Sequence, residues 1–377
     1  MGAGDLRGAL AQGLDGIWLA VLVGSLATLA GLPLAGPLVQ LFGADPGVVG
    51  YATTYLRWAF LGVVPLLVVL AATGLLRGLQ DTRTPLVVAV AGNLLNVVLN
   101  LCLVYGVGRF GGLGIAGSAI GTDLAQLATA TALVTVAVRV ARREGASVRP
   151  DLPGVRRAAH AGVALVVRTL TLRAALLVAT AGSAALGAAA TATQQLAMTV
   201  WTFLAFALDA LAIAAQAITG RTLGAGDVAR TRAATDRMVR WGLASGVVTG
   251  LLLAAVAPFL GALFTRDPAV RDLLVPVLLV AAVFQPVAGV VFVLDGVLIG
   301  AGDGRYLAWG GIAVLVVFVP LAWVAVALGS SLVWLWVAFG LGFIGSRCVV
   351  LVHRSRTDRW LVTGIGHEPS AKVERQP

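Results

Sequence analysis

Ten long apolar runs constrain this chain more than any other feature of its sequence. Each run holds about 20 apolar residues, enough to cross the hydrocarbon core of a bilayer as an α-helix. Main-chain polar groups find no water there, so such runs must form helices that pair these groups internally. The sequence therefore predicts an all-α polytopic membrane protein. The runs cover residues 14 to 42, 49 to 76, 85 to 106, 114 to 138, 158 to 183, 186 to 220, 241 to 264, 273 to 301, 306 to 329 and 330 to 352.

The composition agrees with a membrane protein, and the positions of the charged residues exclude a nucleic-acid-binding protein. Hydrophobic residues make up 59% of the chain and charged residues 12%, against roughly 25% charged residues in a soluble domain. The formal net charge of +10 raises the possibility of nucleic-acid binding. The basic residues lie in loops between apolar runs, however, without the interleaved aromatic residues of a nucleic-acid surface. We expect the lipid bilayer, and no nucleic acid, as a partner.

An internal repeat with a constant spacing of 222 residues organises the chain. Residues 2 to 83 align without gaps with residues 224 to 305, and 23 of these 82 positions are identical. The matches concentrate at turns: Gly2 to Asp5 recur as Gly224 to Asp227, and the stretch from Leu75 to Pro85 recurs in weaker form from Val297. The chain therefore consists of two copies of one unit.

The charges of the loops predict the orientation in the cell membrane. When alternate loops are assigned to alternate sides, twenty basic residues fall on one side and three on the other. Basic loops stay in the cytoplasm, so both termini and the repeated turns are predicted to be cytoplasmic. The three basic residues on the opposite side are Arg109, Arg266 and Arg271.

The repeat also predicts the lobes. We expect an N-terminal lobe of four spans (1 to 139), a cytoplasmic linker (140 to 155), a C-terminal lobe of six spans (156 to 355) and a cytoplasmic tail (356 to 377). The second copy carries two additional spans before its Gly-Ala-Gly-Asp turn, whereas the first copy begins at that turn. Two helices are therefore expected to be absent from the N-terminus. The turns themselves lack a Walker lysine, and we interpret them as helix caps.

Three amides inside one run are candidates for a binding site. Asn93, Asn96 and Asn100 follow the spacing i, i+3 and i+7, which places them on one helical face among apolar neighbours. They can line a polar cavity, or they can hydrogen-bond to a neighbouring helix. The equivalent run of the second copy has no such stripe, which favours the cavity.

Carboxylates inside the runs are the second group of candidates, because charge in hydrocarbon is costly and marks ion paths or ion pairs. Asp209 and Asp295 can be neutralised by Arg168 or Arg173, or they can bind substrate or ions. Asp123 has no evident cationic partner, so a proton-carrying role is open to it. No ligand-spaced Cys or His pair, nucleophile and base, or nucleotide motif occurs. We therefore expect no metal, no cofactor and no enzyme.

Several separated motifs resemble the multidrug and toxic compound extrusion (MATE) family, in the branch named for the DNA-damage-inducible protein F. They are LLRGLQDTRTPL followed by AGNLLNVVLN, GRTLGAGD, FQP and LDGVLIGAGD, and the resemblance runs from Gly2 to about Arg359. It implies a fold of twelve helices in two lobes of six that face a central cavity. About ten of these helices are expected here. Asn96 matches a cavity Asn of the family, and Asn100 is an amide where many relatives carry a carboxylate.

The resemblance implies a secondary-active antiporter that exports organic cations or amphiphilic compounds in exchange for protons or sodium ions. Internal repeats and polar residues on helix faces are what alternating access requires. We expect a monomer. Two alternatives stay open: a truncated, non-transporting remnant or membrane structural subunit, and a flippase of lipid-linked precursors, for which a more cationic cavity is expected.

Overall fold

The protein is represented by a computed structural model that describes residues 6 to 41, 46 to 107, 110 to 328 and 331 to 363. Within these residues the chain forms two compact units, one extending to His160 and the other starting at Ala161. The division lies within a long helix, α6 (Leu152–Ala185). The first Gly-Ala-Gly-Asp turn lies outside the described residues.

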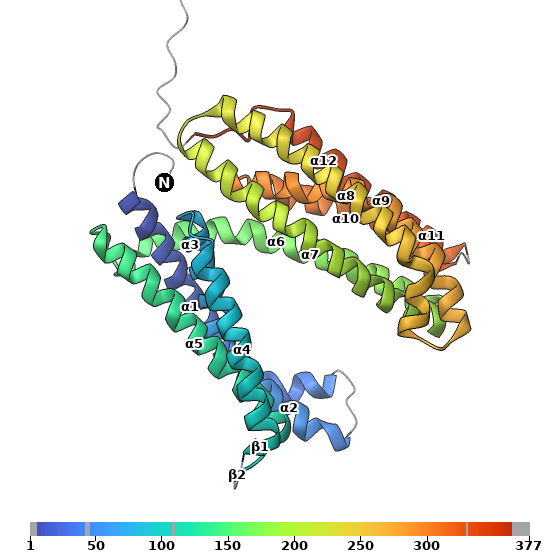
Figure 1. Cartoon of the computed structure of the whole chain (residues 1–377), viewed down its shortest axis with the longest axis horizontal. Coiled ribbons are helices and arrows are strands. Elements are labelled where there is room, and N and C mark those ends of the chain that lie inside the picture. Colours follow the sequence, from blue (N-terminus) through green and yellow to red (C-terminus); the bar gives the residue numbers. More distant parts are fainter. Residues whose placement is uncertain (1–5, 42–45, 108–109, 329–330, 364–377) are drawn as a thin grey trace, which may run out of the picture. The chain divides into compact units, whose positions relative to one another are not determined.

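The first unit is a bundle of helices with one short β-hairpin. Helix α1 packs against α2 and α3, and α5 packs against α2, α3 and α4. The hairpin joins α4 to α5 by antiparallel pairing of β1 with β2 (Figure 1). The elements are α1 (Leu6–Leu41), α2 (Pro46–Leu61), α3 (Val63–Gly78), α4 (Arg83–Tyr105), β1 (Gly106–Val107), β2 (Phe110–Gly111) and α5 (Gly114–Arg143).

The second unit is built around α9, which packs against α7, α8, α11 and α12. More than half of the most apolar stretch of α9 is buried, whereas none of the corresponding stretch of α4 is buried. The elements after α6 are α7 (Ala188–Gly224), α8 (Val228–Phe264), α9 (Pro268–Gly300), α10 (Gly304–Ala327), α11 (Leu332–Ala338), the π-helical segment η1 (Phe339–Gly345) and α12 (Ser346–Ser355).

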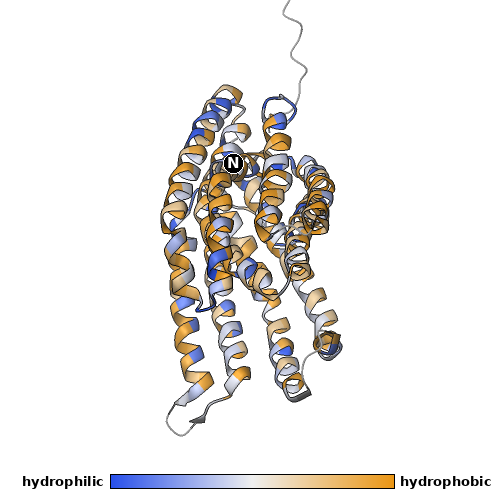
Figure 2. Ribbon diagram, turned by 90° about the vertical axis from the view of Figure 1, so that its right-hand side faces the viewer, coloured by the Kyte–Doolittle hydropathy of each residue, from blue (hydrophilic) through white to orange (hydrophobic). Residues whose placement is uncertain are grey.

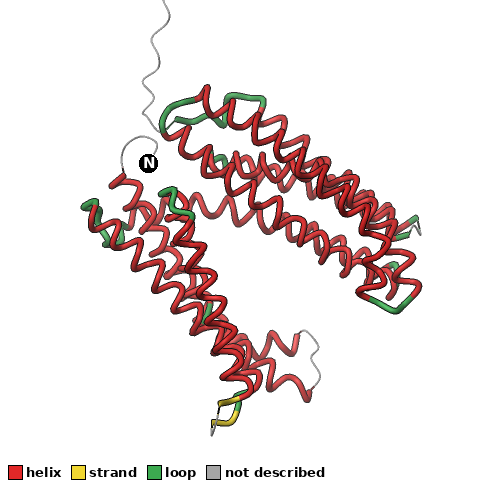
Figure 3. The backbone as a smooth tube through the Cα atoms, in the orientation of Figure 1, coloured by secondary structure: helices red, strands yellow, loops and turns green. Residues whose placement is uncertain are grey.

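The described residues contain ten helical spans that are long and apolar enough to cross a membrane, and they coincide with the ten predicted runs (Figure 3). The all-α fold is thereby confirmed. The helices extend beyond the apolar runs at both ends of the predicted linker, because α5 continues to Arg143 and α6 begins at Leu152. Between these helices the linker contacts α1: the amide of Asp151 donates to Asp15 Oδ1 at 3.0 Å.

Two spans depart from a continuous α-helix. The second is interrupted at Gly62, between α2 and α3, and Pro65 follows three residues later. The tenth passes through η1, whose glycines allow close packing. A methyl group placed on Gly340 would lie 2.1 Å from the Phe284 ring, and one on Gly342 would lie 2.9 Å from Leu321.

The turns of the repeat have the same geometry in both copies. The amide of Asp81 donates to the carbonyl of Leu76 at 3.0 Å. The amide of Asp303 donates to the carbonyl of Leu298 at the same distance. Such bonds satisfy the last carbonyls of a helix. The predicted capping role is confirmed for the second Gly-Ala-Gly-Asp turn, where the Asp227 side chain accepts from the amide of Arg230 at 2.8 Å.

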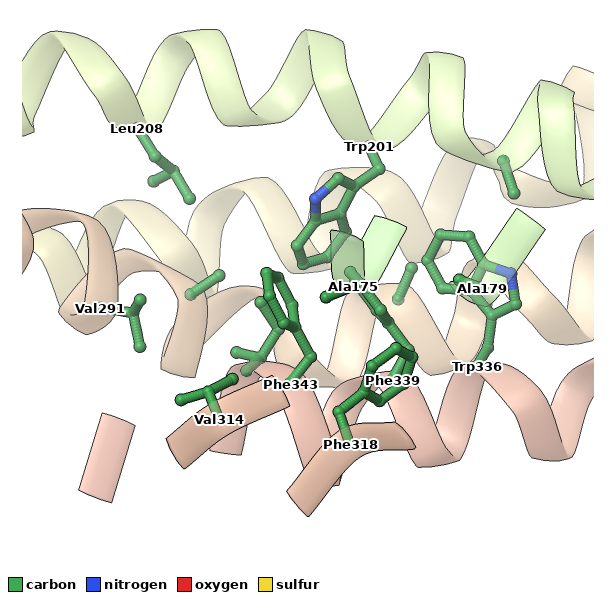
Figure 4. Close-up of a cluster of buried hydrophobic side chains, with 14 of the residues drawn as sticks. Ala175, Ala179, Trp201, Leu208, Val291, Val314, Phe318, Trp336, Phe339 and Phe343 are labelled. Atoms are coloured by element: carbon green, nitrogen blue, oxygen red, sulfur yellow. The ribbon is translucent and has the colours of Figure 1, made fainter. Parts of the chain in front are cut away.

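Aromatic side chains form the centre of the second unit's core. Phe339 and Phe343 stack with their centroids 4.9 Å apart, and Trp201 of α7 meets Phe339 edge to face at 5.6 Å (Figure 4). The indole N–H of buried Trp336 donates to Gln194 Oε1 at 2.7 Å, so the polar atom of this ring is satisfied. The cluster joins α7, α10 and the last span.

Hydrophobic residues predominate along the helices of both units (Figure 2), and many large apolar side chains are exposed. Leu94 on α4, Phe203 on α7 and Trp309 on α10 are all more than 60% exposed. Such a surface would be an aggregation risk in water, but it is what lipid tails require. The fold is therefore that of a multi-pass membrane protein.

Candidate functional site

The predicted amides of α4 form a polar cluster with α5 in the first unit. Asn96 Nδ2 donates to Thr122 Oγ1 at 3.2 Å, and Asn100 Nδ2 donates to both the main-chain oxygen and Oδ1 of Asn96 at 3.0 Å. Asn93 is exposed, whereas Asn96 and Asn100 are half-buried. The structure thus brings two of the three amides together and leaves Asn93 outside the hydrogen-bonded cluster among the described residues.

Glycines of α5 allow the two helices to approach this closely. A methyl group on Gly121 would lie 3.2 Å from the amide nitrogen of Asn100, and one on Gly117 would lie 2.3 Å from the carbonyl oxygen of Leu103. The close approach leaves Asn100 Oδ1 buried without a hydrogen-bond partner in the described part of the chain. An orphaned acceptor at membrane depth is available to a ligand that carries a donor or a positive charge.

Asp123 lies one residue beyond Thr122 and is directed to another neighbour. Its carboxyl packs against Gly62, at the interruption between α2 and α3, because a methyl group on Gly62 would lie 2.0 Å from Asp123 Oδ1. Asp123 Oδ2 is buried and has no hydrogen-bond partner among the described residues. The first unit therefore has two separate polar positions, the amide cluster and Asp123.

A charged cluster occupies the second unit. The carboxylate of Asp295 on α9 accepts from Arg168 Nε of α6 at 3.2 Å and lies 3.1 Å from Arg347 Nη2 of α12. Arg168 Nη2 also bonds to the second oxygen of Asp295. Asp295 is only 6% exposed, and the three side chains line one small pocket with residues of α10. Two cations thus share one carboxylate away from water.

The remaining candidate carboxylate is placed differently. Asp209 on α7 is exposed, as is Arg173 on α6. Among the described residues neither forms an ion pair with the cluster around Asp295. Of the two open interpretations, direct pairing with arginine therefore applies to Asp295. Asp209 is exposed and acts on Arg168 as a more distant negative charge.

Sequence reasoning missed two members of these clusters. Arg347 lies within the last apolar run, and a cation in hydrocarbon is itself a signal that could have identified it. Thr122 carries no such signal, because threonine is common in membrane helices and only the contact with Asn96 gives it a role.

The clusters supply hydrogen-bond donors and acceptors. The described residues contain no group of three or more His, Cys, Asp or Glu that could hold a metal ion.

Comparison with known proteins decides the family. The family model MatE matches residues 1–102 and 162–324, which is well over half of the chain. The chain belongs to the MatE family. The resemblance to MATE transporters is thereby confirmed at the level of the family, which is one of membrane transporters and not of enzymes.

Curated MatE relatives occur in plants and bacteria. Protein DETOXIFICATION 44 of Arabidopsis thaliana is 32% identical over 316 residues, which cover 82% of this chain and 58% of the relative. DNA damage-inducible protein F of Escherichia coli is 29% identical over 332 residues, covering 84% of this chain and 69% of the relative. The chain spans about 60% of the length of the plant relatives.

Solved MatE structures share the fold. MATE in the straight conformation superposes with a TM-score of 0.83 over 93% of this chain and 79% of that chain, at 20% identity. A MOP superfamily transporter from Pyrococcus furiosus gives a TM-score of 0.84, also at 20% identity and with the same coverage. At such identities the agreement concerns the fold, and it confirms the predicted MATE-like helical bundle.

Proposed function

We propose that the chain is a secondary-active multidrug efflux antiporter of the branch named for DNA-damage-inducible protein F. It exports organic cations or amphiphilic compounds in exchange for protons or sodium ions. The observation that carries this proposal is the amide cluster of Asn96 and Asn100, a polar position with an orphaned buried acceptor inside an apolar helical unit. Apolar walls with a few placed polar groups suit an amphiphilic ligand.

Two named relatives support efflux of drugs. The probable multidrug resistance protein NorM of Bradyrhizobium diazoefficiens is 30% identical over 375 residues, covering 94% of this chain. The multidrug resistance protein NorM of Burkholderia vietnamiensis is 32% identical over 305 residues. The solved structures also include MATE in complex with the ligand MaD3S.

We assign the substrate to the face of Asn93, Asn96 and Asn100. The coupling ion is assigned to the carboxylates at membrane depth, Asp123, Asp209 and Asp295. The protein acts as a monomer with both termini in the cytoplasm, where its basic loops are retained. The two lobes are residues 1 to 139 and 156 to 355.

Efflux of a fluorescent organic cation tests this proposal. The chain is expressed in a strain lacking its own exporters, with and without an N-terminal extension that supplies two further helices. Retention of the dye falls in cells with an active antiporter, and Asn100→Leu restores retention while the amount of protein in the membrane is unchanged. Efflux would be contradicted if cells with the protein, both with and without the N-terminal extension, retained as much dye as cells that lack the protein.

The charged cluster of the second unit favours one second candidate, the flippase of lipid-linked precursors. Arg168 and Arg347 bring two guanidinium groups together at the one carboxylate of Asp295, and paired guanidinium groups suit a phosphate group. The Pyrococcus furiosus transporter is likewise described by a reverse polarity of its binding pocket that suggests a different function. Movement of a fluorescent polyprenyl phosphate across the bilayer of proteoliposomes distinguishes the two candidates.

A further inference from the structure

The interruption of the second span at Gly62 frees main-chain acceptors inside the membrane. Pro65 has no N–H, so the carbonyl of Leu61, four residues earlier, loses its helical donor. The amide of Leu66 donates to Gly62 at 3.1 Å, which resumes the helix after the interruption. On the other side, Thr28 Oγ1 of α1 donates to the carbonyl of Phe60 at 2.6 Å. The interruption is therefore a weak point of the span whose carbonyls take side-chain donors.

The carboxyl of Asp123 is seated on this interruption. A methyl group on Gly62 would lie 2.0 Å from Asp123 Oδ1, and the same point is 3.4 Å from the carbonyl oxygen of Ala59. Glycine is needed here because any side chain would displace the carboxyl. The carboxyl and the main chain of the interruption are therefore direct neighbours, and Asp123 Oδ2 has no partner in the described chain.

No charged group among the described residues neutralises Asp123. The carboxyl forms no ion pair there, and it lies about 14 Å along α5 from the start of the helix, at 1.5 Å per residue. An ionised carboxylate at that depth is costly. The titratable and charged groups on the helices packed against α5 are Arg7 and Asp15 on α1, Tyr51, Tyr55 and Arg57 on α2, Arg77 on α3, and Arg83, Cys102 and Tyr105 on α4.

The second copy of the repeat shows that the fold does not require a carboxyl here. Phe284 stands at the repeat position of Gly62, and α9 continues through it as one helix from Pro268 to Gly300. The Phe284 ring fills the space above Gly340 on the last span. An apolar ring thus makes the helix contact in one copy, whereas a glycine and an aspartate make it in the other.

We propose that Asp123 is the proton-binding site of the antiporter and that its protonation sets the bend between α2 and α3. In the neutral acid the O–H group donates to a main-chain carbonyl of the interruption. The carbonyl of Ala59 is one of those near Gly62. When the proton leaves to water, the donor is lost, the carboxylate takes up water, and the interruption changes its bend. This inference rests on the proposed antiport and names the ion and the residue that binds it.

Infrared difference spectroscopy of the purified chain tests the binding site without substrate. As the pH is lowered from neutral to mildly acidic, a C=O band of a neutral carboxylic acid should appear in the native protein and should be absent from Asp123→Asn. The matched control, Asp236→Asn, removes an exposed carboxyl of α8 and should leave the band. Gly62→Ala displaces the carboxyl and should shift the band and the pH at which it disappears. An unchanged band in Asp123→Asn overturns the proposal.

A fluorescence titration tests the bend. Trp58 is four residues before Gly62, and its carbonyl accepts from the Gly62 amide at 3.3 Å. The fluorescence component that Trp58→Phe removes should change with pH in the native chain and should be constant in Asp123→Asn. A pH-dependent component that survives in Asp123→Asn overturns the coupling. These spectra do not depend on transport. If the carboxyl band of Asp123 is present but the chain shows no efflux, the proposed antiport is contradicted and the proton-binding site is not.

Discussion

Gln80 and Gly302, which are 222 residues apart, have the same left-handed backbone conformation. Their φ angles are 66° and 78°, and Gln80 is the one non-glycine residue with positive φ among the described residues. Their amides donate to the carbonyls of Arg77 and Ile299, each at 3.0 Å. Both copies of the repeat therefore have the same turn geometry, although only the second copy has glycine, the residue that suits a positive φ.

Gln80→Gly should stabilise the protein, because a residue with a Cβ costs about 1 kcal/mol in the left-handed region and glycine does not. Thermal unfolding in detergent should show a higher midpoint for the variant. The matched change, Gly302→Gln, should lower the midpoint by a comparable amount. A lower midpoint for Gln80→Gly would mean that the Gln80 side chain makes a contribution larger than its strain.

Asp295→Asn should destabilise the second unit strongly. The substitution leaves Arg168 and Arg347 without their shared counter-ion, and removal of one partner from a buried ion pair costs about 3 to 5 kcal/mol. The control is Asp358→Asn, whose pair with Arg232 is exposed and should cost less than about 1 kcal/mol. Chemical unfolding followed by intrinsic fluorescence measures both. Equal effects would show that the cluster is hydrated in the membrane.

Asn96→Leu and Asn100→Leu should abolish substrate binding and leave the fold intact. The hydrogen bond between Asn96 and Thr122 should contribute only about 0.6 kcal/mol to stability, the average for such bonds between membrane helices. Binding of a fluorescent cation and the melting temperature should be measured together, with Thr122→Val as the variant that removes only this bond. Unchanged binding with a lowered melting temperature would assign the amides to helix packing.

Asn100→Asp should make substrate binding more dependent on pH, because a carboxyl titrates where an amide does not. Binding curves of the native chain and the variant at several pH values provide the test. Identical pH profiles would show that position 100 does not face the substrate or its coupling ion.

Acid should weaken the turn before α4. The Thr84 side chain and then its amide, which donates to Asp81 Oδ1 at 2.9 Å, lower the pKa of the Asp81 carboxyl below its ordinary value. A lowered folded pKa gives a stability contribution that is present above the unfolded pKa of about 3.9 and is lost as the pH falls through the folded pKa. The stability difference between the native chain and Asp81→Asn should therefore shrink in acid. A difference that is constant with pH would contradict this role.

The ten spans could be predicted because hydropathy is a property of consecutive residues, and the apolar runs and the helices coincide. The amide stripe was predictable for the same reason, since Asn96 and Asn100 share a face by spacing alone. The cluster around Asp295 was not predictable in full. Its arginines are 127 residues before and 52 residues after it, and a single sequence does not reveal which distant helices pack together.

The interruption at Gly62 shows another limit. Gly62 and Pro65 are visible in the sequence, but proline and glycine occur within many membrane helices without interrupting them. Pro258 lies within the continuous helix α8, and Pro320 within α10. What distinguishes Gly62 is the carboxyl of Asp123 seated on it, and this contact depends on how α5 packs.

The hydrogen bond from the Asp151 amide to Asp15 has a consequence for biosynthesis. Asp15 lies in α1, and its partner leaves the ribosome 136 residues later. The carbonyl of Val148, to which the Trp18 indole N–H donates at 3.2 Å, likewise emerges long after Trp18. Chains commonly fold one domain at a time during synthesis, beginning at the N-terminus. These late bonds can close only when the whole first unit has been translated, so they mark its completion before the six remaining spans are inserted.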